Sequence, residues 1–129
     1  MSMNSVLERA DRFMIDPEGL RTEKESWMVC RRCQHTIANS TMKFNVEGTH
    51  EHLQCNPDGF TFVFGCYKDA PGCQVVGQAT NQYTWFNGFQ WRLAICQECY
   101  HHLGWYFNAK GQNYGFFGLI SNCVRETKS

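Results

Sequence analysis

The stretch TWFNGFQWRLAICQECYHHLGWYF, residues 84–107, combines a dense cluster of aromatic side chains with a pair of closely spaced thiols. Three of the chain's four tryptophans fall within it, and its middle reads Cys96-Gln97-Glu98-Cys99. Such rings can simply fill a hydrophobic core, or they can form the wall of a binding pocket that a metal ion holds in place. The cysteines and turns in the rest of the chain distinguish between these two interpretations.

A second Cys-x-x-Cys pair, Cys30 and Cys33, lies far upstream of the first pair, Cys96 and Cys99. Each pair follows a strand-like apolar run and enters a polar turn. Two such pairs supply four thiolates, which is the tetrahedral ligand set of a structural zinc ion. We therefore predict one structural Zn²⁺ on these four residues. The alternative is two disulfides or a redox-active pair. Four thiolates would also close the coordination sphere and leave no position for a catalytic water.

The other four cysteines have no metal-ligand spacing; they are Cys55, Cys66, Cys73 and Cys123. In a reducing compartment we expect them to be buried apolar side chains or free thiols. In a secreted protein they could form two disulfides, and the sequence does not choose among the three possible pairings. Both alternatives stay open at this point.

Short apolar runs separated by Gly, Asn and Pro predict antiparallel strands after residue 25. The runs lie at residues 27–30, 44–46, 60–67, 73–77, 89–96, 104–107 and 116–120. Aromatic residues make up 15% of the chain, which also favours β-structure. We expect an N-terminal extension over residues 1–25 with a possible short helix, one mainly β domain over residues 26–125, and a C-terminal tail over residues 126–129.

Composition limits the possible partners and compartments. The length of 129 residues fits one domain. Lys plus Arg number 12 and Asp plus Glu number 12, and this balance argues against nucleic acid as a partner. No apolar run approaches the roughly 20 residues of a membrane helix, so we expect no membrane association. The N-terminus has no apolar signal region, so we expect a cytoplasmic or nuclear protein, or a secreted one if a signal peptide has been removed.

Six motifs, in this order and spacing, resemble the CULT domain family. The motifs are Cys30-x-x-Cys33, Asn56-Pro57-x-Gly59, Thr84-Trp85-Phe86-x-Gly88-Phe89-x-Trp91, Cys96-x-x-Cys99, His102-Leu103-Gly104-Trp105-x-Phe107 and Phe116-Phe117-Gly118-Leu119. The family includes the thalidomide-binding region of cereblon and single-domain proteins, and the resemblance covers about residues 27–124. It implies the β-tent fold, in which two antiparallel sheets meet at an angle and a structural zinc on the four cysteines pins them together.

The resemblance also implies a binding site for cyclic imides. The family's aromatic cage is matched by Trp85, Trp91, Trp105 and Phe107. Its ligands are glutarimide and succinimide rings, thalidomide-type drugs, uracil-like rings and cyclic imides at protein C-termini. The Tyr83 carbonyl and the Trp85 N–H match the main-chain groups that bind the imide, with Thr84 between them. Asn56 and Pro57 match the rim of the pocket.

The spacing of the aromatic residues supports a shared face in part. Trp105 and Phe107 are two positions apart, so they point to the same side of a strand. Trp85 and Trp91 are an even number of positions apart, but the Asn87-Gly88 turn interrupts any strand between them. The alternative is that these rings are only core.

Several departures from the family limit what the resemblance implies about partners. Tyr83 stands where human-type cereblon has His, so a side-chain contact at the rim differs while the main-chain contact should survive. Asp58, Phe60 and Phe62 also differ, at a surface used for drug-induced partner proteins, so we do not expect such recruitment. Cereblon's Lon-like domain and adaptor-binding helices have no counterpart here. We therefore expect a monomer that does not bind a ubiquitin-ligase adaptor through this chain alone.

The predicted function is a non-enzymatic binding module, with two alternatives. An aromatic cage can also bind a methylated ammonium ion by cation–π attraction. Such sites often add a carboxylate, but the only one between residues 84 and 107 is Glu98, within the Cys-x-x-Cys pair. The second alternative is a methionine sulfoxide reductase of the B type that uses Cys123. The sequence Ser121-Asn122-Cys123-Val124 lacks that enzyme's Arg-x-Cys-x-Asn-like motif.

Overall fold

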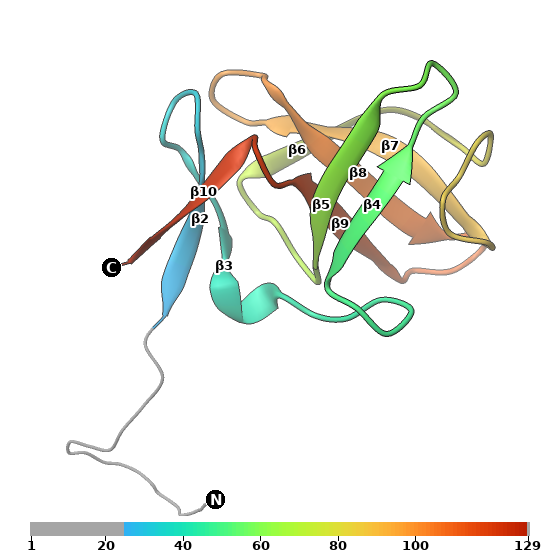
Figure 1. Cartoon of the computed structure of the whole chain (residues 1–129), viewed down its shortest axis with the longest axis horizontal. Helices are drawn as coiled ribbons and strands as arrows, with labels where there is room; N and C mark the ends of the chain where they lie inside the picture. The colour runs from blue at the N-terminus through green and yellow to red at the C-terminus, as the bar shows by residue number, and fades with distance from the viewer. Residues whose placement is uncertain (1–24, 129) are drawn as a thin grey trace, which may run out of the picture.

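Two antiparallel β-sheets make up the protein in the computed structural model, which describes residues 25–128 (Figure 1). The small sheet has the order β10 (Val124–Lys128), β2 (Ser26–Cys30), β3 (Thr36–Asn39). The large sheet has the order β4 (Glu51–Cys55), β5 (Thr61–Tyr67), β9 (Gly115–Ile120), β8 (His102–Ala109), β7 (Phe89–Cys96), β6 (Cys73–Thr80). The predicted fold class, mainly β with two antiparallel sheets, is confirmed.

Little helix accompanies these sheets. Within residues 25–128 a single 3₁₀ turn, η1 (Ser40–Met42), follows β3 and leads toward the large sheet. The Asn39 side chain caps this turn by accepting a hydrogen bond from the Thr41 N–H at 2.8 Å. No helix of residues 25–128 is long and apolar enough to cross a membrane. The short helix predicted within residues 1–25 falls almost entirely outside the described residues.

The first core fills the space between the two sheets. It contains Met28, Ile37, Ala38, Tyr67, Ala94, Leu103, Phe117, Leu119 and Val124, together with the buried cysteines Cys30, Cys73 and Cys96. These side chains come from all three strands of the small sheet and from one face of the large sheet. Burial of their apolar surface holds the two sheets together.

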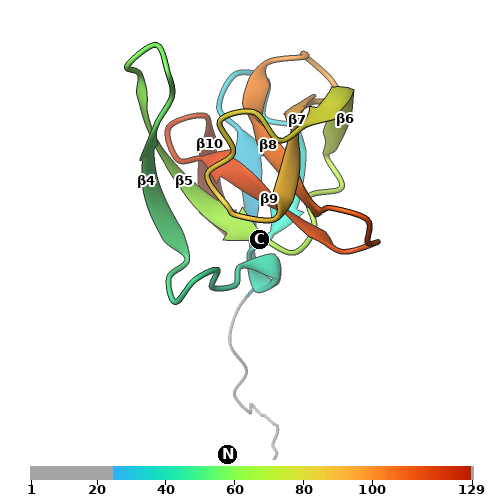
Figure 2. The same ribbon diagram turned by 90° about the vertical axis from the view of Figure 1, so that its right-hand side faces the viewer.

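A second core lies on the opposite face of the large sheet. It contains Phe64, Cys66, Phe86, Trp105, Phe107, Phe116 and Ile120. Phe86 belongs to the loop between β6 and β7, so this loop covers the sheet and completes the core. Figure 2 shows the large sheet curling, with β4 and β5 on one side and β6 and β7 on the other. The hollow of the curl carries the second core.

Strand β9 is buried on both faces. Phe117 and Leu119 point into the first core, while Phe116 and Ile120 point into the second. The sequence FFGLI is therefore apolar at successive positions, as expected for a strand that is covered on both sides.

A bulge in β8 directs the pocket residues to the second core. Ala94 pairs with Gly104 and Ile95 pairs with His102, so Leu103 is an extra residue with no partner on β7. The bulge changes the alternation of side chains along the strand. Leu103 consequently packs in the first core, whereas Trp105 and Phe107 pack in the second.

Two glycines allow β8 and β9 to approach closely. A Cβ at Gly104 would lie 1.8 Å from the carbonyl oxygen of Gly118. A Cβ at Gly118 would lie 2.8 Å from the Phe64 ring and 3.1 Å from the Phe107 ring. The absence of both side chains lets the aromatic rings pack directly against the backbone of β9.

The structure corrects the predicted organisation at two places. Residues 44–46 form no strand, and Val46 makes only an isolated bridge to Thr49. Residues 126–128, which we expected in a C-terminal tail, continue strand β10 and pair with Met28, Trp27 and Ser26. The sequence of this strand, VRETK, contains charged residues and no apolar run, so the pattern did not predict a strand. Its backbone nevertheless pairs with β2.

Candidate functional site

Two equivalent turns present the four Cys-x-x-Cys thiols. The Cys30 carbonyl accepts a hydrogen bond from the Gln34 N–H at 2.8 Å, and the Cys96 carbonyl accepts one from Tyr100 at 2.9 Å. Gln34 and Tyr100 both adopt left-handed backbone, with φ of 70° and 63°. The first turn follows β2 of the small sheet and the second follows β7 of the large sheet, so the same local fold recurs on each sheet.

The four sulfur atoms have the spacing of a tetrahedral metal site. Cys30 Sγ lies 3.7 Å from Cys99 Sγ, and Cys33 Sγ lies 3.5 Å from Cys96 Sγ. All four lie within 4.8 Å of one another. Sulfur atoms about 2.3 Å from a central ion in a tetrahedron are about 3.8 Å apart, whereas a disulfide requires about 2.05 Å. The predicted ligands therefore could hold one metal ion that joins the two sheets.

The cysteines outside this cluster are free thiols. All eight cysteines of the chain lie in the described range, and none forms a disulfide. Cys66 and Cys73 are buried, and burial raises the pKa of each thiol to about 12. Cys55 is exposed at the end of β4. The sequence left open whether these four cysteines are free thiols or form two disulfides, and in the structure they are free thiols.

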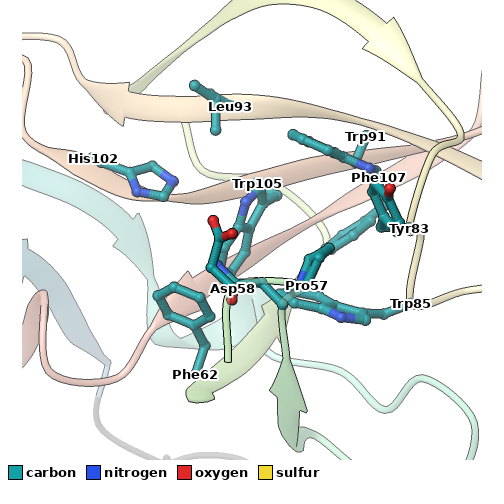
Figure 3. A pocket seen from close by; sticks show the side chains of 11 residues that line it. Pro57, Asp58, Phe62, Tyr83, Trp85, Trp91, Leu93, His102, Trp105 and Phe107 are labelled. Carbon is teal, nitrogen blue, oxygen red and sulfur yellow. The ribbon is translucent and has the colours of Figure 1, made fainter. Parts of the chain in front are cut away.

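A cavity of about 520 Å³ lies in the hollow of the large sheet (Figure 3). Seven of the eight ligand-site residues predicted from the sequence line this one cavity: Asn56, Pro57, Tyr83, Trp85, Trp91, Trp105 and Phe107. Two strands position three of the rings. Trp91 on β7 pairs directly with Phe107 on β8. Trp105 lies on β8 as well, two positions before Phe107. The loop between β6 and β7 brings Trp85 against them.

Perpendicular ring contacts form one corner of this cage. The Trp85 and Trp105 rings lie 4.9 Å apart at an interplanar angle of 85°. Phe64 stacks behind Trp85 at 5.5 Å, and Phe62 meets Trp105 edge-on at 5.1 Å. Such edge-to-face pairs are favourable beyond the area that they bury. The corner is therefore closely packed.

Two indole N–H groups anchor the cage to the surrounding loops. Trp85 Nε1 donates to the Cys55 carbonyl at 3.1 Å, and Trp91 Nε1 donates to the Gln82 carbonyl at 2.8 Å. These bonds fix the ring planes without any ligand. A cage fixed in this way loses little conformational entropy when a ligand enters.

Three polar groups on residues that line the cavity have no partner among residues 25–128. The Tyr83 carbonyl and the Trp85 main-chain N–H make no hydrogen bond, and Tyr83 adopts left-handed backbone with φ of 57°. The third group is the indole N–H of Trp105, whose side chain is only 7% exposed. A buried donor without a partner costs about 1–3 kcal/mol. The cage therefore offers two donors and one acceptor to a ligand.

The cavity also contains four residues that we did not predict from the sequence as ligand-site residues: Asp58, Phe62, Leu93 and His102. Leu93 could have been found, because it lies two positions from Trp91 on the same strand. Asp58 could not be placed from spacing, since it reaches the cavity through the turn between β4 and β5. The carboxylate that we did not find between residues 84 and 107 is thus supplied from elsewhere in the chain.

His102 is a neutral acceptor at the wall of the cavity. Burial lowers the pKa of His102, and the hydrogen bond to Gly104 opposes this effect. Its Nε2 lies 2.8 Å from the Gly104 carbonyl, which can only accept, so Nε2 carries the proton. The other ring nitrogen, Nδ1, is then left with its lone pair.

Two predicted residues have mainly local roles. The Asn56 side chain accepts the Phe60 N–H at 2.9 Å and so closes the turn that forms the rim. Thr84 does not line the cavity with the cage residues. Its hydroxyl donates to the Phe86 carbonyl at 3.2 Å, and Thr84 lines a different hollow together with Lys110. Its contribution is to the shape of the β6–β7 loop.

Cys123 has no feature of an activated nucleophile. It lines a second cavity that shares Phe62 and His102 with the first. Burial raises the pKa of its thiol, the charge of Cys30 raises it further, and Arg31 only partly opposes them. A reactive thiol needs the opposite shift, because the thiolate is the nucleophile.

These features define a class of protein, a two-sheet β domain with four clustered cysteines that could hold a metal ion and with an aromatic pocket. No protein-family model matches the chain. The chain is 33% identical over 113 residues to "Protein cereblon" of Drosophila erecta, which is 81% of this chain and 19% of that protein. It is 31% identical over 113 residues to "Protein cereblon" of Drosophila melanogaster, with the same coverage of 81% and 19%.

The similarity extends to a third relative, "Protein cereblon" of Drosophila persimilis, at 29% identity over 132 residues, or 91% of this chain and 21% of that protein. The chain contains a cereblon-like CULT domain, as the motifs predicted. It spans about a fifth of the length of these curated relatives, with coverage of 19% to 21%.

Proposed function

We propose that this domain binds cyclic imides in the aromatic cage. The observation that carries the proposal is the set of three unpaired polar groups. An imide presents one N–H between two carbonyls. The Tyr83 carbonyl can accept the N–H, while the Trp85 main-chain N–H and the Trp105 indole can each donate to a carbonyl. The donors and acceptor of the cage match those of the ligand.

The rings of the cage suit the other part of an imide. The methylene groups of a glutarimide would be buried against Trp85, Trp91 and Trp105, and each buried methylene contributes about 0.8 kcal/mol. Small-molecule sites generally combine such apolar walls with a few polar groups. Glutarimide, succinimide, uracil-like rings and a cyclised protein C-terminus all share this chemistry.

The metal of the four-cysteine site is zinc in this proposal, and its role is structural. Four thiolates in a tetrahedron are the common ligand set of structural zinc. Cys30, Cys33, Cys96 and Cys99 would hold the ion and thereby fix β2 to β7. The bound ion would neutralise part of the thiolate charge that otherwise opposes this packing.

Titration with glutarimide, followed by tryptophan fluorescence and calorimetry, tests the proposal. We expect saturable binding to the wild-type domain. N-methylglutarimide should bind roughly tenfold to a hundredfold more weakly, because it cannot donate to the Tyr83 carbonyl and leaves it unpaired. Trp105→Ala should abolish binding, since it removes both a wall and a donor.

A matched control separates binding from folding. Trp27→Phe alters the one tryptophan outside the cage, which lies on β2 of the small sheet, and should leave glutarimide binding unchanged. Circular dichroism should show that both variants are folded. Unchanged glutarimide affinity in a folded Trp105→Ala variant would refute the assignment of the cage.

A methylated ammonium ion is a second candidate ligand, and Asp58 favours it. Aromatic cages bind such cations through their ring faces, and a carboxylate at the cage strengthens the attraction. Asp58 lines the cavity with Trp85, Trp91 and Trp105. Trimethyl-lysine in the same titration distinguishes the two candidates. Binding of trimethyl-lysine without binding of glutarimide would select the ammonium ligand.

A non-enzymatic role is the remaining part of the proposal. The raised pKa of Cys123 speaks against a sulfoxide reductase, and a closed four-thiolate site leaves no position for a reactive water. Eight cysteines without a disulfide suit a reducing compartment, such as cytoplasm or nucleus. We further propose that the domain acts as a monomer, without nucleic acid or a ubiquitin-ligase adaptor as partner.

A further inference from the structure

The cavity has two chemically different ends. Figure 3 shows Tyr83, Trp85, Trp91 and Phe107 at one end and Asp58, Phe62, Leu93 and His102 at the other, with Trp105 between them. The first end carries the unpaired groups that suit an imide. The second end carries the carboxylate of Asp58 and the free ring nitrogen of His102. Both of these groups are hydrogen-bond acceptors.

The charge of Asp58 is not compensated in the structure. Its carboxylate makes no ion pair and no hydrogen bond with any residue from 25 to 128. No Lys or Arg is among the described residues that line the cavity. The cavity therefore carries a net negative charge beside neutral aromatic walls.

The cavity is larger than an imide ring requires. Its volume of about 520 Å³ lies within the range of roughly 300–1,000 Å³ that is typical of sites for drug-sized ligands. A ring of six atoms held by Tyr83 and Trp85 would leave the Asp58 end vacant. A complete ligand thus has a second part, and that part meets two acceptors and one negative charge.

We infer that the preferred ligand is a cyclic imide with a cationic hydrogen-bond donor on a short arm, which reaches Asp58 and His102. This inference rests on the imide binding proposed above and specifies the ligand of the same site. An ammonium group offers three donors and a positive charge, which match the two acceptors and the carboxylate. The imide ring of the ligand would occupy the aromatic end of the cavity. Asp58 would determine the preference for a cationic arm at the other end.

Two glutarimides that differ only in charge test this inference. One carries a primary amine on a two-carbon arm at the ring carbon beside a carbonyl, and the other carries the same arm with the amine acetylated. Wild-type protein should bind the amine about fivefold more tightly, as for a partly exposed ion pair. Raising the salt concentration should reduce this preference, because salt screens exposed charges.

Asp58→Asn is the decisive variant, since it keeps the size and removes the charge. It should bind the amine and its acetylated counterpart with equal affinity. Glu51→Gln is the matched control, because it removes an exposed carboxylate from β4 outside the cavity, and it should retain the fivefold preference. Melting temperatures and metal content should be unchanged in both variants.

The outcomes separate this inference from the proposed function. If unsubstituted glutarimide binds but the charged arm gives no preference, or if the preference persists in Asp58→Asn, the role of Asp58 is wrong and imide binding stands. If no glutarimide binds to folded, metal-containing protein, the proposed function fails and this inference fails with it.

Discussion

Gly104 fixes the distance between β8 and β9, because a Cβ there would overlap the Gly118 carbonyl oxygen at 1.8 Å. Gly104→Ala is therefore expected to lower the free energy of unfolding by at least about 3 kcal/mol, the upper range for overpacking. Gly88→Ala is the control. Gly88 has φ of +86° but open space around it, so it should lose only about 1–2 kcal/mol. Urea unfolding of both variants measures the difference, and equal losses would contradict the close approach.

The Cys66 thiol makes the stability of the domain sensitive to alkaline pH. Burial raises its pKa to about 12 in the folded state, whereas an unfolded thiol ionises near about 8.5. Above that lower value the unfolded state releases a proton that the folded state retains. The contribution to stability is therefore complete below about pH 8.5 and is lost as the pH rises toward 12.

Replacement of this thiol tests its part in the alkaline loss. Cys66→Ala should be less stable than wild type at neutral pH, because it leaves a small cavity. The difference between the two proteins should narrow as urea unfolding is repeated from pH 7.5 to pH 10. A constant difference over this range would show that Cys66 does not titrate between the folded and unfolded states.

Site residues that belong to sequence motifs could be predicted, whereas a site residue that a turn brings to the cavity could not. The four clustered cysteines follow from their motif spacing, the cage rings follow from the resemblance to the CULT family, and the structure brings each set together. Asp58 reaches the cavity only because the β4–β5 turn folds over it. No periodicity in the sequence encodes that placement. The polarity of one end of the pocket was missed for the same reason.

At the scale of the element, strand β10 forms one edge of the small sheet and pairs with β2 over its full length. Val124 is 3% exposed and belongs to the first core. Val124→Ala should therefore cost about 2 kcal/mol. Arg125→Ala, on the outward side of the same strand, should change the free energy of unfolding by less than about 0.5 kcal/mol. Thermal unfolding distinguishes them, and equal effects would mean that β10 is not packed on the core.

Strands with apolar runs were recognisable, and strands held by polar contacts were not. The runs at 60–67, 89–96 and 116–120 became β5, β7 and β9. Strand β4 was missed because His52 takes a core position, where it stacks on Phe64 at 5.6 Å. Conversely, the apolar run at 44–46 forms no strand. Phe44 and Val46 pack against the second core from a loop. A short apolar run looks the same in the sequence whether it forms a strand or a buried loop.

At the scale of the whole molecule, a metal ion on the four clustered cysteines would connect the two sheets through one thiol pair from each. Removal of the metal by a chelator, or Cys30→Ser, is expected to unfold the domain or lower its melting temperature severely, because metal binding contributes directly to folding. Cys55→Ser is the control, since Cys55 is exposed and outside the cluster. Metal analysis and circular dichroism provide the readout. A Cys30→Ser variant with full metal content and an unchanged melting temperature would overturn the assignment.

The pairing of β2 with β10 has a mechanical consequence. Ser26 lies opposite Lys128, and Cys30 lies opposite Val124. A force that pulls residues 26 and 128 apart therefore opens this ladder like a zipper, one hydrogen bond after another. The opening runs from Ser26 toward Cys30, where a metal-bound thiolate would stop it. From that point the load would pass through the coordinated thiols to Cys96 and Cys99 and so into the large sheet.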